Sequence, residues 1–120
     1  MAPRSPGVDA GRTAVGYGLQ LAFPDAAAWK DQAARVRKVA HPWLIQNNTP
    51  FSSDIDLIVS DNAASGGTCF GDSGGPNFVG SSTVIAGVNS FVYNSQCAGF
   101  SAVYRIDKAD DVNWLATFFD

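Results

Sequence analysis

Hydrophobic and polar residues change their period once along the chain, near residue 107. Before that point, β-branched and aromatic residues form short runs bounded by glycine, serine and asparagine, a pattern typical of strands and turns. After it, apolar residues recur every three or four positions, as on one face of a helix. This predicted helix begins at Asp107 or Asp110, either of which can cap it. Its apolar face carries Val112, Leu115 and Phe119.

The sequence predicts six strands. They cover residues 13–18, 54–60, 77–80, 83–88, 90–93 and 101–106. Residues 26–34 have a helix-forming composition and residues 36–39 favour a strand, so this region remains ambiguous. Residues 62–67 form a polar loop of small side chains. The pattern predicts an all-β body with a terminal helix.

Composition limits the size and the partners of this body. A chain of 120 residues, 46% of them hydrophobic, is one domain at most. The formal net charge is −3, and the eight Lys and Arg residues are scattered except for Arg35, Arg37 and Lys38. We therefore expect no nucleic-acid partner and no anionic membrane partner. The chain contains no apolar run of about 20 residues, and its N-terminus lacks the apolar region of a signal peptide.

Two cysteines, Cys69 and Cys97, bracket the most distinctive stretch of the chain. They lack the spacing of a metal site, which leaves two buried thiols or a disulfide. A disulfide closing this loop would stabilise the fold by about 3 to 4 kcal/mol and would imply an oxidising compartment. Because no signal peptide is visible, we expect that the chain lacks its natural beginning.

Between the cysteines lies Gly71-Asp72-Ser73-Gly74-Gly75-Pro76. A serine among glycines can project its hydroxyl while neighbouring N–H groups converge on a ligand. Such a nucleophile needs a base and a group that orients the base, and the alternative is a glycine-rich turn with a solvated serine. The motif also fits the nucleophile elbow of α/β-hydrolases. That family needs a histidine after the serine, and none follows Ser73.

The run Thr68 to Pro76 resembles the C-terminal half of a chymotrypsin/trypsin-type serine protease, most similar to secreted bacterial members. Residues 87–91, Cys97, residues 102–104 and the terminal helix follow at suitable distances, and residues 16–18 are similar to the G-W-G element of that family. The resemblance implies the second, antiparallel Greek-key β-barrel of the trypsin-like fold, with a C-terminal α-helix. Residues 1–12 would be a linker remnant, and residues 13–120 would form the barrel.

The resemblance also implies roles for single residues. Ser73 would be the nucleophile, and the N–H groups of Gly71 and Ser73 would form the oxyanion hole. Asp72 would pair with the new N-terminus that zymogen cleavage creates. Cys69 and Cys97 would form the disulfide beside the primary specificity pocket.

The specificity pocket is predicted from the same resemblance. Gly67 falls where trypsin-like members place an acid, so no charge would pair with a substrate Arg or Lys. Val92 and Ala102 replace glycines that would leave the pocket open, which favours small or medium neutral side chains. The expected substrate-binding residues are Gly67, Thr68, Ser90, Phe91, Val92 and Ala102.

The catalytic histidine and aspartate motifs of the family, which lie on its first barrel, are absent from this sequence. His41 and Asp54 precede Ser73 in the right order and are an alternative base and orienter. Their separations of 13 and 19 residues are much shorter than a two-barrel arrangement gives. We expect His41 to be a surface or turn residue and Asp54 a strand or loop carboxylate.

The sequence therefore predicts a secreted serine endopeptidase, present as a C-terminal half that is nearly inactive alone. Its expected partners are a peptide or protein substrate and the missing N-terminal barrel. The alternative function is a non-catalytic, stand-alone binding or regulatory remnant. We expect no cofactor and no metal, because Asp54, Asp56 and Asp61 lack the glycine and terminal glutamate of an EF-hand loop.

Overall fold

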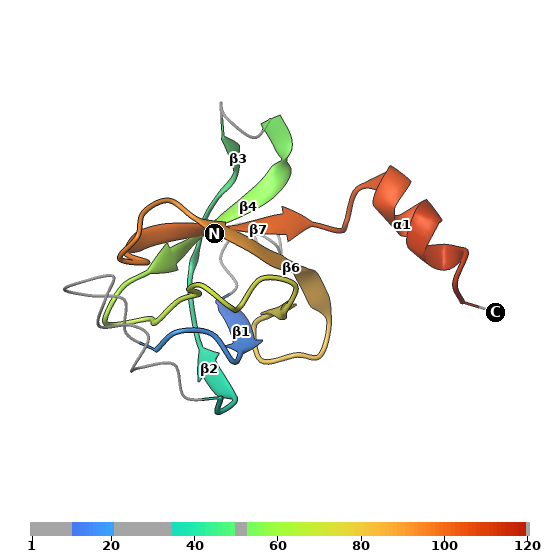
Figure 1. Ribbon diagram of the computed structural model, residues 1–120. Coiled ribbons are helices and arrows are strands. Elements are labelled where there is room, and N and C mark those ends of the chain that lie inside the picture. The colour runs from blue at the N-terminus through green and yellow to red at the C-terminus, as the bar shows by residue number, and fades with distance from the viewer. Residues whose placement is uncertain (1–10, 21–34, 50–52, 120) are drawn as a thin grey trace, which may run out of the picture.

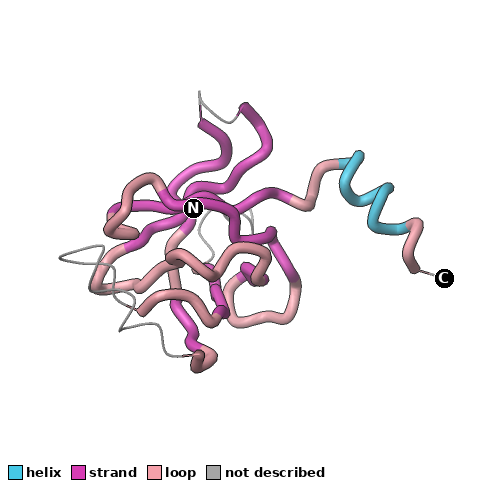
Figure 2. The backbone as a smooth tube through the Cα atoms, viewed as in Figure 1, coloured by secondary structure: helices cyan, strands magenta, loops and turns pink. Residues whose placement is uncertain are grey.

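The computed structural model describes residues 11–20, 35–49 and 53–119. Seven strands and one helix make up these parts, with the strands gathered on one side and the helix projecting from the other (Figures 1 and 2). Residues 1–10 of the linker predicted over residues 1–12, and the predicted helical composition of residues 26–34, lie outside the described residues. The first strand begins at Arg12, one residue before the predicted start of the barrel. No helix in the described parts has the length and hydrophobicity needed to cross a bilayer.

All neighbouring strands pair antiparallel, in the order β2-β1-β5-β6-β7-β4-β3. Strands β5, β6 and β7 form a meander, and β4 returns to pair with β7, which is the Greek-key arrangement. The bounds are β1 Arg12–Gly16, β2 Lys38–Ala40, β3 Leu44–Thr49, β4 Ser53–Asp61, β5 Pro76–Val79, β6 Ile85–Val92, β7 Gly99–Arg105 and α1 Ala109–Ala116.

The two edges of this sheet meet, so that it curls into a barrel. The edge strands β2 and β3 are consecutive in the chain and are separated by residues 41–43. Pro42 has no N–H group and so interrupts the strand. Its carbonyl accepts the N–H of Arg12 at 2.7 Å, while the carbonyl of Trp43 accepts the N–H of Ser60 at 2.8 Å. This short segment therefore joins β1 to β4 and closes the barrel.

A small hydrophobic core fills the barrel. Its centre is Leu57, Val59 and Val103, with Leu44 and Ala86 packed against them. The sequence predicts a half-buried β4, but residues 56–61 are all buried. The outer side of β4 is covered near Ser60, whose hydroxyl accepts the N–H of Trp43 at 2.8 Å and lies 2.9 Å from the hydroxyl of Ser65.

Two strands differ from the prediction. The two strands predicted over residues 83–88 and 90–93 are replaced by one continuous strand, β6, over Ile85–Val92, which carries an irregularity between Asn89 and Phe91. The strand β3 was not predicted from the sequence. That strand is rich in polar residues and pairs with β4 through two register shifts, so regular alternation of apolar residues is lost.

The helix α1 forms where the apolar period predicts it, but the predicted aspartate cap is wrong. Lys108 occupies the N-cap position without a side-chain hydrogen bond. Asp107 instead pairs with Arg105, and Asp110 lies in the first turn, where a negative charge favours the helix dipole.

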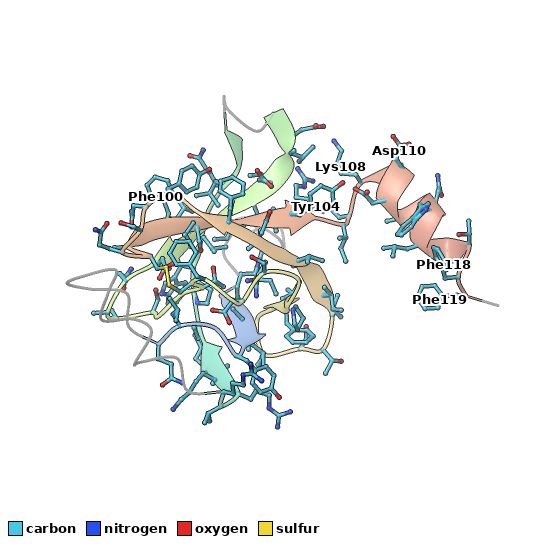
Figure 3. The ribbon with its side chains drawn as sticks, in the orientation of Figure 1. Phe100, Tyr104, Lys108, Asp110, Phe118 and Phe119 are labelled. Atoms are coloured by element: carbon cyan, nitrogen blue, oxygen red, sulfur yellow. A yellow bond between two sulfur atoms is a disulfide. The ribbon has the colours of Figure 1, made fainter. Side chains whose placement is uncertain are left out.

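No residue of α1 is buried. Trp114 is 62% exposed and Phe119 is 75% exposed. The rings of Trp114 and Phe118 pack edge to face, with centroids 4.9 Å apart. Phe118 and Phe119 lie at the end of the helix away from the strands (Figure 3). The apolar side chains of α1 are thus largely uncovered in this chain.

Candidate active site

The predicted nucleophile lies in the loop between β4 and β5, residues 69–75, which we call the serine loop. Gly71 and Gly74 take φ values of +98° and +85°, which strongly favour glycine. They flank Ser73, which is exposed. The Ser73 hydroxyl donates to the carbonyl oxygen of Ser90 at 3.0 Å. The turn therefore presents the hydroxyl at the surface, with a carbonyl as its partner.

The backbone N–H groups of the serine loop divide into two sets. Those of Asp72, Gly74 and Gly75 donate to backbone carbonyls at 2.9 to 3.0 Å. Across the described parts of the chain, the N–H groups of Gly71 and Ser73 donate to no protein acceptor. These two are the groups that the resemblance assigns to the oxyanion hole. Because they are unused, they are available to an oxygen atom of a ligand.

Asp72 fixes the serine loop to the chain after β1. One carboxylate oxygen accepts the N–H of Gly18 at 2.8 Å, and the other accepts the N–H of Cys69 at 2.9 Å. A Cβ on Gly16 would lie 1.8 Å from the first of these oxygens. The glycines of the Gly16-Tyr17-Gly18 element are therefore needed for this close approach. The pairing of Asp72 with a new N-terminus stays a prediction, and here both of its oxygens are occupied by main-chain donors.

A pocket of about 140 Å³ opens beside Ser73. Of the six predicted substrate-binding residues, Thr68, Ser90, Phe91 and Val92 line it, while Gly67 and Ala102 do not. Ala102 is fully buried in β7. Two further lining residues, Phe70 and Asn89, were not predicted from the sequence.

Aromatic packing supports the pocket wall. The ring of Phe91 contacts that of Tyr93, with centroids 5.2 Å apart, and Tyr93 contacts Phe100 at 4.7 Å. Such tilted ring pairs contribute about 0.5 to 1.5 kcal/mol each beyond the area that they bury. The repeated aromatic residues after Ser90 are the signal that could have predicted this cluster.

The two cysteines form a disulfide, so the alternative of two free thiols is wrong. The Cys69–Cys97 bond joins the serine loop to the segment between β6 and β7, with the two Cα atoms 5.3 Å apart. Cys69 lines the pocket, so the disulfide ties one residue of the pocket wall covalently to that segment.

The structure does not bring His41 or Asp54 to Ser73, and neither lines the pocket. His41 has its contact elsewhere, because its Nδ1 lies 3.4 Å from the hydroxyl oxygen of Thr13. Asp54 forms an ion pair with Lys108. It is at the far end of β4, seven residues before Asp61, which corresponds to about 23 Å at the rise of a strand. The described residues therefore hold no base for Ser73.

The comparisons with known proteins agree with this geometry. The sequence matches the Trypsin family over residues 3–114. The chain belongs to the trypsin family.

Among solved structures, this trypsin-family chain is similar to a mutant of human heparin binding protein, with a TM-score of 0.67 and 17% sequence identity. The match covers 93% of this chain and 45% of that protein, so the chain spans less than half of its relative. No curated protein sequence matches. At this identity the likeness concerns the fold, and it confirms the antiparallel barrel with its C-terminal helix.

A second cavity, of about 530 Å³, lies next to the serine loop and contains a buried carboxyl group. Asp61, at the end of β4, is 6% exposed. Burial, and then the negative charge of Asp72, raise the pKa of Asp61 to about 7. No cluster of three or more potential metal ligands occurs in the described parts of the chain.

Proposed function

We propose that this chain carries the nucleophile and the oxyanion hole of a serine endopeptidase. The observation that supports this most directly is the pattern of unused donors. The exposed hydroxyl of Ser73 lies beside a pocket, and the N–H groups of Gly71 and Ser73 have no protein acceptor. This combination of a projecting hydroxyl and free main-chain donors suits acyl transfer.

In the proposed reaction the Ser73 oxygen attacks the peptide carbonyl, and its proton passes to a histidine supplied by another segment. The carbonyl oxygen gains the negative charge and accepts the N–H groups of Gly71 and Ser73. The histidine then gives its proton to the leaving amine, and water releases the acyl group from Ser73. Removing one such donor costs about 3 to 4 kcal/mol in related enzymes, because the donors are fixed before the charge develops.

The pocket suggests the class of side chain at the cleaved bond. Its volume is about 140 Å³, and Phe91 and Val92 occupy the wall. Asp72, the acidic residue of its described lining, already accepts main-chain N–H groups with both carboxylate oxygens, which leaves it poorly placed to pair with a cation. We propose small or medium neutral side chains for this position.

A second barrel is the proposed partner. The uncovered apolar side chains of α1 support this, and so does the groove of about 650 Å³ between α1 and the strands. Val84, Ile85, Val112, Leu115 and Phe119 contribute to its apolar lining. A barrel docked here would cover apolar surface that a stable protein rarely leaves exposed. The disulfide is consistent with an oxidising compartment, and we propose secretion, as in the bacterial members that the sequence resembles.

One observation favours the second candidate, a non-catalytic binding function. The Ser73 hydroxyl donates to a carbonyl, and His41, the one histidine of the sequence, contacts Thr13 instead. A serine without its base loses several orders of magnitude in rate. We therefore expect the 120-residue chain alone to be nearly inactive on peptides.

An endopeptidase assay of the natural gene product separates the two candidates. Ser73→Ala should abolish cleavage of a denatured protein substrate, whereas Ser95→Ala, at an exposed loop serine, should leave it unchanged. Activity that survives Ser73→Ala would contradict the proposed nucleophile. A folded natural product without any peptidase activity would favour the binding function.

A further inference from the structure

Asn89, one of the residues that line the pocket beside Ser73, is a buried amide in the middle of β6. The residue is 2% exposed and belongs to a wall that also carries Phe91. The N–H of Asn89 donates to the carbonyl of Gly75 at 2.9 Å, and the carbonyl of Asn89 accepts the N–H of Gly74 at 2.9 Å. These two bonds tie β6 to the serine loop, so Asn89 has a fixed place next to the proposed nucleophile.

Only one half of the Asn89 side-chain amide is satisfied. Its Oδ1 accepts a side-chain N–H of Asn77 at 3.2 Å, whereas its Nδ2 is buried and has no hydrogen-bond partner in the described parts of the chain. A Cβ on Gly75 would lie 3.2 Å from that Nδ2, which places the nitrogen against the serine loop, two residues after Ser73. Leaving a buried N–H group unpaired is costly, so an acceptor oxygen of a ligand would gain the bond that the protein leaves unmade.

The rest of the lining narrows the class of that ligand. Asp72 is the charged side chain of the described lining, and both of its oxygens already accept main-chain N–H groups. The described lining holds no cationic side chain, so a ligand carboxylate would lack a counter-charge there. A carboxamide is uncharged and offers both an acceptor oxygen and two donors. It therefore complements the Asn89 amide without adding a charge beside Asp72.

We propose that Asn89 is a specificity-determining residue, which selects a side-chain carboxamide, that of asparagine or glutamine, at the cleaved bond. This proposal rests on the proposed function, because it assigns the pocket to the residue whose carbonyl Ser73 attacks. It narrows the small or medium neutral side chains to those that carry an amide. A site with a buried donor discriminates strongly against an apolar side chain of similar size, since that side chain leaves the donor unpaired.

The first test compares peptide substrates of the natural gene product that differ only in the residue at the cleaved bond. We expect kcat/KM to be at least tenfold higher after Gln than after Met, or at least tenfold higher after Asn than after Leu. The preferred amide should also exceed its own acid, Glu or Asp, at least tenfold. The proposal is overturned if neither amide exceeds its apolar counterpart, or if the acid is cleaved as well as the amide.

Two variants test the residue itself. Asn89→Val removes the donor from the pocket at a strand position that suits a β-branched residue, and the amide preference should fall below threefold. Asn77→Val is the matched control, because it removes the same hydrogen bond between the two amides from a residue that does not line the pocket. The control should keep the amide preference. A preference that survives Asn89→Val, or that is lost equally in both variants, would contradict the proposal.

A binding measurement separates this proposal from that of the nucleophile. The 120-residue chain is titrated with N-acetyl-glutaminamide and N-acetyl-asparaginamide, and with the methionine and leucine analogues, while NMR follows the side-chain NH₂ group of Asn89. We expect saturable shifts with at least one of the two amides, and at least tenfold weaker binding of its apolar analogue. If the natural gene product cleaves no peptide, the proposed nucleophile fails, and this titration still decides the role of Asn89. An Asn89 signal that neither amide shifts would overturn the proposal.

Discussion

Replacing Asp61 by Asn should change the pH dependence of stability without changing the shape of the site. Asn has almost the same volume as Asp but cannot ionise. In the wild-type protein, burial and the charge of Asp72 raise the pKa of Asp61 to about 7. The variant should therefore not lose stability at higher pH through ionisation of a buried carboxyl group.

The size of this change in unfolding free energy follows from the protonation equilibria of Asp61 in the folded and the unfolded protein. The pKa of Asp61 is higher in the folded protein than its ordinary 3.8. Its contribution to stability is therefore fully present below pH 3.8 and is lost as the pH rises to 7. At about 1.36 kcal/mol for each pKa unit, the loss approaches about 4 kcal/mol above pH 7. Between pH 5 and pH 8.5 the same equilibria give a change of about 2.5 kcal/mol.

Urea unfolding followed by far-UV circular dichroism measures this effect. The difference in unfolding free energy between Asp61→Asn and wild type should grow by about 2.5 kcal/mol in favour of the variant from pH 5 to pH 8.5. Asp110→Asn, at an exposed position of α1, should give a difference that is nearly constant with pH. A constant difference for Asp61→Asn as well would refute the reasoning, because it would mean that Asp61 does not hold its proton in the folded protein.

Three other variants, and Gly11→Ala as a control, test the scaffold by the same unfolding measurement. Cys69→Ala with Cys97→Ala should lower the unfolding free energy by about 3.5 kcal/mol, because it removes a cross-link between residues 28 positions apart; a loss below about 1 kcal/mol would contradict this. Gly87→Ala should cost more than about 2 kcal/mol, since its Cβ would lie 2.4 Å from a backbone carbonyl oxygen of β7. Gly11→Ala has open space around it and should differ little from wild type. Asp72→Asn should cost about 1.5 to 3 kcal/mol, because its amide can accept only one of the two N–H bonds through its oxygen; full stability would show that those bonds are not formed.

The sequence allowed most of the fold to be predicted where local pattern and packing agree. The apolar period identified α1, and the β-branched runs identified β4, β6 and β7. The strand β3 was missed because its residues are polar and its pairing with β4 is irregular. The capping prediction failed because Asp107 pairs with Arg105 two residues before it, which leaves Lys108 at the N-cap. Both errors arise from contacts with other parts of the chain or between side chains. The propensities of neighbouring residues carry no information about such contacts.

The serine loop was predictable because its chemistry lies in consecutive residues. The glycines on either side of Ser73 mark the left-handed turns that the structure contains. The burial of the Asp61 carboxyl was not predictable in this way. In the sequence it is one of three nearby aspartates, and only the turn over residues 62–66 brings it against Gly67. Only this contact explains why position 67 is a glycine, because a Cβ there would lie 2.0 Å from an Asp61 carboxylate oxygen.

We propose that Ser73 is the nucleophile of an acyl-transfer enzyme. The most direct test is covalent labelling of the natural gene product with a fluorophosphonate, with the modified residue located by mass spectrometry. We predict a single adduct on Ser73, and no adduct on the 120-residue chain alone, where the base is missing. Absence of label at Ser73 in the natural product, under conditions that label a known serine hydrolase added to the same sample, would contradict the claim.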